Sequence, residues 1–151
     1  MGAAAMLALA CSLPCVAQDR TQDQGQWRAD SAMAKAITSD IAISDKKVSI
    51  DFVGFTIVPA RKLGPTEVAA AFDADVNAGR TGSLYRISVA AGTRFEHHNT
   101  LCGTEDTQWM ATYVEGRTLQ VAFFSGSSPP VLTVDALANT MDRCGTFMYS
   151  R

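Results

Sequence analysis

The sequence predicts a mainly β fold, namely a small antiparallel barrel or sandwich of about seven strands with a short N-terminal helix. Three observations predict this fold class. Runs of alternating apolar and polar residues recur along the chain, which is typical of strands with one buried face. Residues that favour turns, above all glycine, proline and asparagine, separate these runs. Two cysteines far apart in the sequence are each followed by glycine, and a disulfide between them would fasten such a sheet.

Residues 1–17 are predicted to be a secretory signal peptide. The run from Ala3 to Leu13 is apolar, and Cys15-Val16-Ala17 fits the pattern of small residues before a cleavage site. Export signals usually carry a basic residue before the apolar run, and this one carries none. We therefore expect a mature chain that begins at Gln18 and a protein that is periplasmic or secreted.

The apolar leader and the charge of the chain limit the expected partners. A lipid anchor on Cys11 or Cys15 is the alternative to simple cleavage, but neither has the context of a lipoprotein processing site, so we expect none. The leader is shorter than the run of about 20 apolar residues that crosses a bilayer, and no later segment reaches that length. The chain carries 13 basic and 15 acidic residues, with no basic run longer than Lys46-Lys47 or Arg61-Lys62, so nucleic acid is not an expected partner.

The mature chain is predicted to be one domain with a polar lead-in. Residues 18–28 contain glutamine and aspartate but no aliphatic side chain, so we expect them to be flexible before a domain over residues 29–151. A short helix is expected over residues 29–37, where Met33 and Ile37 recur at helical spacing and alanine is common.

Extended segments follow the predicted helix. Residues 41–52 alternate in the manner of a hairpin, and a further run continues over residues 55–58. Pro59 has no N–H group to donate, so it either ends this strand or places it at an edge of the sheet. Residues 66–76 fit a helix or a strand, and the neighbouring strands favour a strand.

The second half of the chain carries the strongest strand signals. Residues 83–89 alternate and predict a strand. The adjacent rings of Phe123 and Phe124 must point to opposite faces of their strand, so one of them covers a second layer or is exposed. The other expected elements are a hairpin with strands at 107–114 and 118–124 around Glu115-Gly116-Arg117, a loop at 125–130, a helical turn near 135–138 and a terminal strand at 144–150.

Cys102 and Cys144 are predicted to form a structural disulfide that ties the last strand to the entry of this hairpin. They are the cysteines that remain after the leader is removed, and in an exported protein such a pair is most simply a bridge. Neither lies in a C-x-x-C motif, so a redox pair is not expected. A zinc site would need His97 and His98 as further ligands, and free or intermolecular thiols are the other alternative.

The sequence contains no convincing catalytic set. A metal-dependent enzyme centred on Glu96, His97 and His98, close before Cys102, is an alternative, because imidazole and thiolate are common ligands for zinc and copper. Adjacent side chains of a strand face opposite ways, however, and a solvated loop is the simpler expectation for this segment. We therefore expect no cofactor and a non-enzymatic module that binds an unknown protein or envelope ligand. Exposed aromatic residues such as Tyr85 or Phe124 would be natural anchors for a protein partner.

Two parts of the sequence resemble other proteins. The residues of the Cys102-Gly103, Phe124-Ser125-Gly126, Pro129-Pro130 and Cys144–Tyr149 segments form a CG…FSG…PP…CGTFxY pattern. In this pattern the chain resembles small, uncharacterised exported bacterial proteins, a likeness that implies no activity. The segment Thr81–Tyr85 also resembles the Ser-Gly-x-x-Tyr element of small periplasmic β-barrel inhibitors of lysozyme, with threonine in place of serine. A lysozyme-inhibitor-like protein is therefore the alternative function that this resemblance implies.

Overall fold

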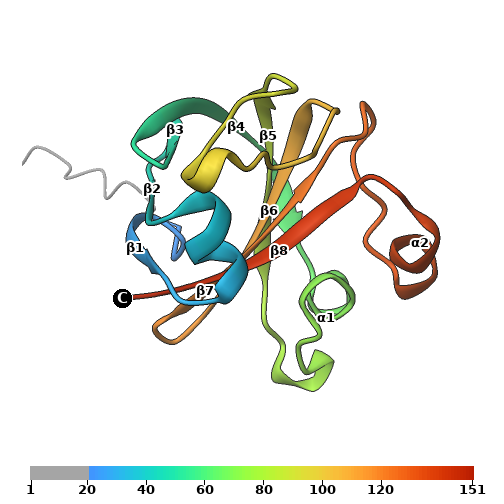
Figure 1. Cartoon of the computed structure of the whole chain (residues 1–151). Coiled ribbons are helices and arrows are strands. Elements are labelled where there is room, and N and C mark those ends of the chain that lie inside the picture. The colour runs from blue at the N-terminus through green and yellow to red at the C-terminus, as the bar shows by residue number, and fades with distance from the viewer. Residues whose placement is uncertain (1–20) are drawn as a thin grey trace, which may run out of the picture.

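The computed structural model describes residues 21–151 and shows a closed antiparallel barrel (Figure 1). Each strand pairs with the next one along the chain, and the last strand closes the barrel on the first. This confirms the mainly β fold class, as a barrel rather than a sandwich. The predicted signal peptide and the start of the lead-in, residues 18–20, lie outside the described residues.

The barrel strands range from three to eleven residues in length, and short helical segments occupy several connections. No helix within residues 21–151 has the length and apolar character that crossing a membrane requires. The strands are β1 (Gly25–Ala29), β2 (Ile41–Ile43), β3 (Lys47–Ile50), β4 (Val53–Leu63), β5 (Gly82–Val89), β6 (Thr107–Glu115), β7 (Thr118–Phe124) and β8 (Arg143–Ser150). The helical segments are η1 (Ala34–Thr38), α1 (Pro65–Phe72), η2 (Val76–Ala78), η3 (Glu96–His98) and α2 (Val134–Asn139).

The structure corrects two expectations for the N-terminal part of the domain. Residues 25–29 form β1 rather than a flexible lead-in, because Trp27 is buried in the barrel and the strand pairs with both β2 and β8. The first helical segment is η1, which is shorter than the predicted helix over residues 29–37. It starts late because Ala29 still pairs with Tyr149 of β8.

The ambiguous segment at residues 66–76 contains helix α1 and not the favoured strand. Pro65 occupies the start of the helix, where its missing N–H group is not needed. Glu67 Oε2 accepts a hydrogen bond of 3.0 Å from the Gly64 amide, which completes a capping arrangement. Val68 and Phe72 are buried against the barrel wall, so tertiary packing and capping together outweigh the strand-like alternation.

Strand β4 continues past Pro59 instead of ending there. A bulge separates Pro59 from Arg61, and the strand then runs on to Leu63. Strand β3 pairs with β4 only as far as Thr56, so the later part of β4 has β5 as its partner on one side alone. Pro59 therefore lies on a free edge, which is the second of the two positions that the sequence allowed.

Two apolar clusters fill the molecule, one inside the barrel and one on its outer wall. The inner cluster draws side chains from every strand, including Phe123 of β7. The outer cluster lies between the faces of β5, β6 and β7 and the segments around α1 and α2, and it buries Phe124. The adjacent rings thus point to opposite faces, as predicted. The predicted strand at residues 83–89, the hairpin, the helical turn and the terminal strand are confirmed.

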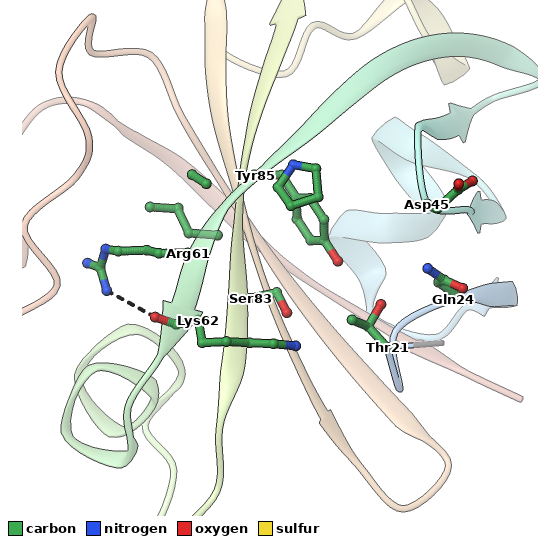
Figure 2. A pocket seen from close by; sticks show the side chains of 10 residues that line it. Thr21, Gln24, Asp45, Arg61, Lys62, Ser83 and Tyr85 are labelled. Carbon is green, nitrogen blue, oxygen red and sulfur yellow. Dashed lines mark hydrogen bonds between the residues drawn. The ribbon is translucent and has the colours of Figure 1, made fainter. Parts of the chain in front are cut away.

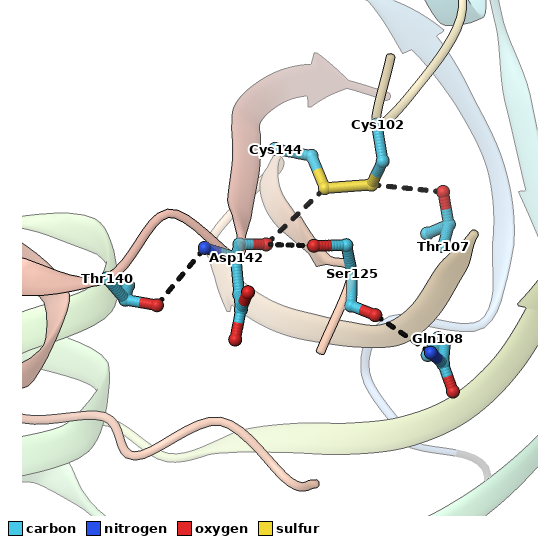
Figure 3. The surroundings of a disulfide bond; sticks show 7 residues. All are labelled: Cys102, Thr107, Gln108, Ser125, Thr140, Asp142 and Cys144. Atoms are coloured by element: carbon cyan, nitrogen blue, oxygen red, sulfur yellow. Dashed lines mark hydrogen bonds between the residues drawn. A yellow bond between two sulfur atoms is a disulfide. The ribbon is translucent and has the colours of Figure 1, made fainter. Parts of the chain in front are cut away.

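The two ends of the barrel are closed by different segments. At the disulfide end, the bond between Cys102 and Cys144 lies where β8 begins (Figure 3), and η3, in the connection after β5, is joined to η1 by a hydrogen bond from Asn99 to Ala36. The two Cα atoms are 4.9 Å apart, and the bond joins the entry of β6 to β8 as predicted. At the opposite end, which we call the mouth end, residues 21–24 lie beside the start of β5 and the end of β6.

Candidate functional site

Asp23 is a buried carboxylate at the mouth end, with only 3% of its surface exposed. Its Oδ2 accepts hydrogen bonds from the Tyr85 hydroxyl at 2.7 Å and from Thr112 Oγ1 at 2.6 Å. Its Oδ1 is buried and has no hydrogen-bond partner among residues 21–151. Most buried polar atoms in proteins are hydrogen-bonded, and leaving one unpaired is costly. This half-satisfied carboxylate is therefore the strongest candidate for a ligand-binding group in the described chain.

The sheet register positions the groups around Asp23. Ser83 of β5 lies directly opposite Thr112 of β6, and both side chains are buried. Tyr85 follows two residues later on the same face of β5, because side chains on one face recur with a period of two. A Cβ atom at Gly82 would collide with the Thr112 carbonyl oxygen, so a glycine is required for the close approach of β5 and β6 here.

The Asp23 backbone also fixes the segment that closes the mouth end. Its carbonyl oxygen accepts a hydrogen bond of 2.8 Å from Nε1 of the buried Trp27. The Arg151 guanidinium stacks on the Trp27 ring, 4.2 Å from its centroid, and donates to the Gln24 carbonyl at 3.2 Å. Residues 21–24 are thus anchored both inside the barrel and to the end of β8.

Two neighbouring cavities open beside this carboxylate. The larger has a volume of about 330 Å³ and includes Tyr85, Pro59 and Asp45 in its wall (Figure 2). The smaller has a volume of about 60 Å³ and includes Asp23. Thr21, Lys62 and Ser83 line both cavities, so we treat the two as one site and call it the mouth pocket.

The mouth pocket contains charges that are not neutralised within it. Figure 2 shows the Lys62 side chain extending beside Ser83 towards Thr21. Lys62 forms no ion pair with any residue of the described segment 21–151, whereas its neighbour Arg61 pairs with Glu67 at 2.6 Å. The hydrogen bond from Arg61 lowers the pKa of Glu67 and correspondingly raises that of Arg61.

Tyr85 is held in its neutral form in this site. Burial, followed by the nearby negative charge of Asp23, raises the pKa of Tyr85 to about 12. At neutral pH the phenol therefore remains a hydrogen-bond donor to Asp23 Oδ2. The pocket can offer a ligand an unpaired carboxylate oxygen, an ammonium group and small hydroxyls, all of which are groups that bind by hydrogen bonding and charge.

The predicted aromatic anchors are not on the surface. Tyr85 is 3% exposed and Phe124 is 1% exposed, so the expectation that they are exposed is wrong. Tyr85 points into the barrel because it lies on the inner face of β5, and Phe124 packs under the outer layer near α2. Tyr85 nevertheless contributes to the mouth pocket, where a small molecule rather than a protein could contact it.

The weak metal candidates lie at the disulfide end, away from the mouth pocket. Glu96, His97 and His98 form η3, and both histidine side chains are exposed. Cys102 and Cys144 are joined to each other and are not available as thiolate ligands. Among residues 21–151, no group of three or more histidine, cysteine, aspartate or glutamate side chains is placed to hold a metal ion.

The segment Thr81–Tyr85, which resembles an inhibitory element, forms the start of β5. Ser83 and Tyr85 are buried, and both line the mouth pocket. Thr81 is exposed and lies at the rim of the smaller cavity. The element is therefore a paired part of the barrel wall, between β4 and β6, and is not presented as a free strand.

Most residues of the mouth pocket carry no signal that distinguishes them in the sequence. Asp23 belongs to a polar segment that the sequence predicts to be flexible, and its partners Tyr85 and Thr112 are 62 and 89 positions away. One residue of the sequence could have indicated that this segment is packed, namely Trp27, a large aromatic residue that the structure buries.

Comparison of the chain with profiles of known families, with curated proteins and with solved structures found no match.

Proposed function

We propose that this protein is an extracytoplasmic, non-enzymatic binding module that holds a small polar ligand in the mouth pocket. The observation that carries the proposal is the buried Asp23 carboxylate, whose Oδ1 lies beside a cavity and has no hydrogen-bond partner in the described part of the chain. A ligand with a donor group would supply the missing hydrogen bond, and bonds to a charged partner contribute about 1.5 to 3 kcal/mol.

The size of the pocket supports a small ligand. Barrels of this strand number are filled by side chains or hold one small molecule. The larger cavity, of about 330 Å³, falls at the lower end of the usual range for ligand sites. Tyr85, Ser83 and Thr112 supply fixed polar groups on rigid strands, which is the arrangement that favours specific binding.

The disulfide supports an extracytoplasmic location. Disulfides persist in oxidising compartments and are rare where thiols are kept reduced. The bond between Cys102 and Cys144, together with the predicted signal peptide, is what would be expected of a periplasmic or secreted protein. The ligand is then a component of the cell envelope or of the surrounding medium.

A variant that fills the pocket without changing its charge tests the proposal. Ala60 is exposed and lines the larger cavity, so Ala60→Trp should occupy that space. Ala90→Trp places the same side chain at an exposed position beyond the other end of β5 and serves as the control. Binding would be measured by saturation-transfer NMR with a panel of amino acids, sugars, nucleosides and polyamines.

We expect at least one compound of the panel to bind the wild type and the Ala90→Trp control but not Ala60→Trp. Binding that is equal in all three proteins, or the absence of binding by every class of compound, would overturn the proposal. Thermal melting of each variant would verify that the barrel is folded.

The lysozyme-inhibitor alternative has one supporting observation, which is the closed barrel itself. The burial of Tyr85 counts against the insertion of this element into an enzyme's cleft. A bacterial lysis assay with lysozyme and the folded protein tests this alternative, because a lack of inhibition at excess protein would exclude it. If inhibition occurs, Tyr85→Ala shows whether the element is responsible.

A further inference from the structure

The charges of the mouth pocket indicate which class of ligand it binds. We infer that the ligand is a small zwitterion, such as a free amino acid or a short peptide, with its ammonium group at Asp23 and its carboxylate at Lys62. This inference rests on the proposed function and adds the chemistry of the ligand to it.

Asp23 requires a positively charged or N–H-bearing partner. Both hydrogen bonds to its Oδ2 come from neutral hydroxyls, those of Tyr85 and Thr112, so they leave its negative charge uncompensated. Within residues 21–151, no lysine, arginine or histidine forms an ion pair with it. Asp45 lines the larger cavity and adds a second carboxylate on that side. An ammonium group would donate to the free Oδ1 and neutralise the buried charge.

Lys62 requires the opposite partner. It lines both cavities, and no carboxylate of the described residues lies within ion-pair distance of its ammonium group. Arg61, the adjacent cation, is already occupied by two hydrogen bonds to Glu67 at 2.9 and 2.6 Å. Lys62, and not Arg61, is therefore the cation that can pair with an anionic group of a ligand in the pocket.

A ligand with a single charge would fit this site poorly. A simple amine would satisfy Asp23 but would place a like charge near Lys62, and a simple carboxylate would lie close to Asp23 and Asp45. Like charges brought together across an interface disfavour binding, whereas complementary pairs favour it. The Thr21 hydroxyl is buried, has no hydrogen-bond partner within residues 21–151 and lines both cavities, where it can act as a donor and an acceptor.

Calorimetric titration with matched probes tests the inference. A panel of amino acids and glycyl dipeptides would be titrated first, followed by the amine and the acid that each lack one charged group of the best ligand. For valine these are isobutylamine and isovalerate. We expect the zwitterion to bind at least about tenfold more tightly than either, since each lost charge pair removes about 1.4 kcal/mol or more.

Two variants assign the two charges. Asp23→Asn should weaken binding of the zwitterion and of the amine about tenfold or more, and should leave the acid unchanged or bound more tightly. Lys62→Met should weaken the zwitterion and the acid in the same way and spare the amine. Lys35→Met, an exposed change at η1, is the control and should bind like the wild type. Because Lys62 is exposed, its variant will remain folded even if Asp23→Asn does not.

Equal affinity for the zwitterion and one of its singly charged analogues would overturn the inference, as would unchanged binding by Lys62→Met. If no zwitterion binds, but another class of compound binds the wild type and does not bind Ala60→Trp, the zwitterion inference fails while the proposed binding function stands. If nothing binds in the pocket, both fail.

Discussion

The two ends of the barrel are closed in different ways. The disulfide end has a covalent bond, and Asn99 Nδ2 of the loop after η3 donates a hydrogen bond of 2.9 Å to the carbonyl of Ala36 in η1. The mouth end is closed by residues 21–24, and it contains Asp23 Oδ1 and Thr21 Oγ1, which are buried and have no hydrogen-bond partner within the described segment. The remaining buried unpartnered atom in residues 21–151 belongs to Arg86, which stacks on Trp109 on the outer wall.

This difference separates the task of stability from the task of binding. Polar groups that are fully paired stabilise a fold, whereas buried groups left unpaired reduce its stability and persist where a function requires them. The covalent bond at one end provides stability that can offset the unpaired groups at the other. We therefore expect changes at the disulfide end to affect unfolding and changes at the mouth end to affect both unfolding and binding.

The largest effect is expected from removal of the disulfide. The double substitution Cys102→Ser, Cys144→Ser frees a loop with a sequence separation of 42, which should lower the free energy of unfolding by about 4 kcal/mol. Denaturant unfolding of the variant and of the wild type, with and without a reducing agent, measures this. A loss below about 1 kcal/mol would contradict the assigned role of the bond.

Gly82→Ala should have the next largest effect, because its Cβ would meet the Thr112 carbonyl oxygen inside the closely paired β5 and β6. We expect a loss of about 2 to 3 kcal/mol in the free energy of unfolding, together with weaker ligand binding. Gly64→Ala is the matched control, since an added Cβ there meets nothing within 4 Å. If both variants unfold at the same denaturant concentration, the close approach of β5 and β6 at Gly82 does not contribute to the stability of the barrel.

Asp23→Ala should lower the free energy of unfolding by about 1 to 3 kcal/mol, because it leaves the hydroxyls of Tyr85 and Thr112 without their acceptor. Asp23→Asn keeps an acceptor oxygen and should cost less. Denaturant melts of both variants measure the difference. Equal losses would mean that the charge of Asp23, rather than its hydrogen bonds, determines the stability of the mouth end.

Tyr85→Phe should make the protein less sensitive to alkali. The pKa of Tyr85 is raised from 10.0 to about 12 in the folded state, so the unfolded chain releases this proton first as the pH rises. The contribution of Tyr85 to the free energy of unfolding is therefore fully present below about pH 10 and is lost between about pH 10 and pH 12. The variant should show a shallower fall of the unfolding free energy over this range. Identical slopes would contradict the burial of this phenol.

The smallest effect is expected from Glu67→Gln on the outer wall. Its ion pair with Arg61 is partly exposed, and pairs of this kind contribute about 1 kcal/mol or less. The capping bond from the Gly64 amide can be retained by glutamine. Thermal melting should show a small decrease that shrinks at high salt, and ligand binding should not change. A loss as large as that of Gly82→Ala would refute this ranking.

The sequence was sufficient to predict the elements whose signal is local. The alternation around Tyr85 and the hairpin at Glu115 predict strands that the structure confirms, and the presence of two cysteines in the predicted mature chain indicates the bond that it contains. Strand β1 was missed because Trp27 is its one large apolar residue, and α1 because Val68 and Phe72 fit both periods.

The candidate site could not be predicted in the same way. Its hydrogen bonds join β5 and β6 to a segment before β1, and such long-range contacts leave no periodic pattern in the sequence. Lys62 likewise becomes distinctive only when the structure pairs Arg61, its neighbour, with Glu67. The closure of the barrel, rather than any motif, brings these groups together.

Amide NMR of the mature protein, titrated with the tightest-binding amino acid or dipeptide of the panel, shows where the ligand binds. We predict that the signals of Asp23, Lys62, Ser83 and Tyr85 will shift in a saturable manner, while those around Cys102 and Cys144 at the disulfide end will not move. Shifts centred on η3 and the disulfide, or no shifts at saturating concentrations of the whole panel, would contradict the assignment of the mouth pocket as the binding site.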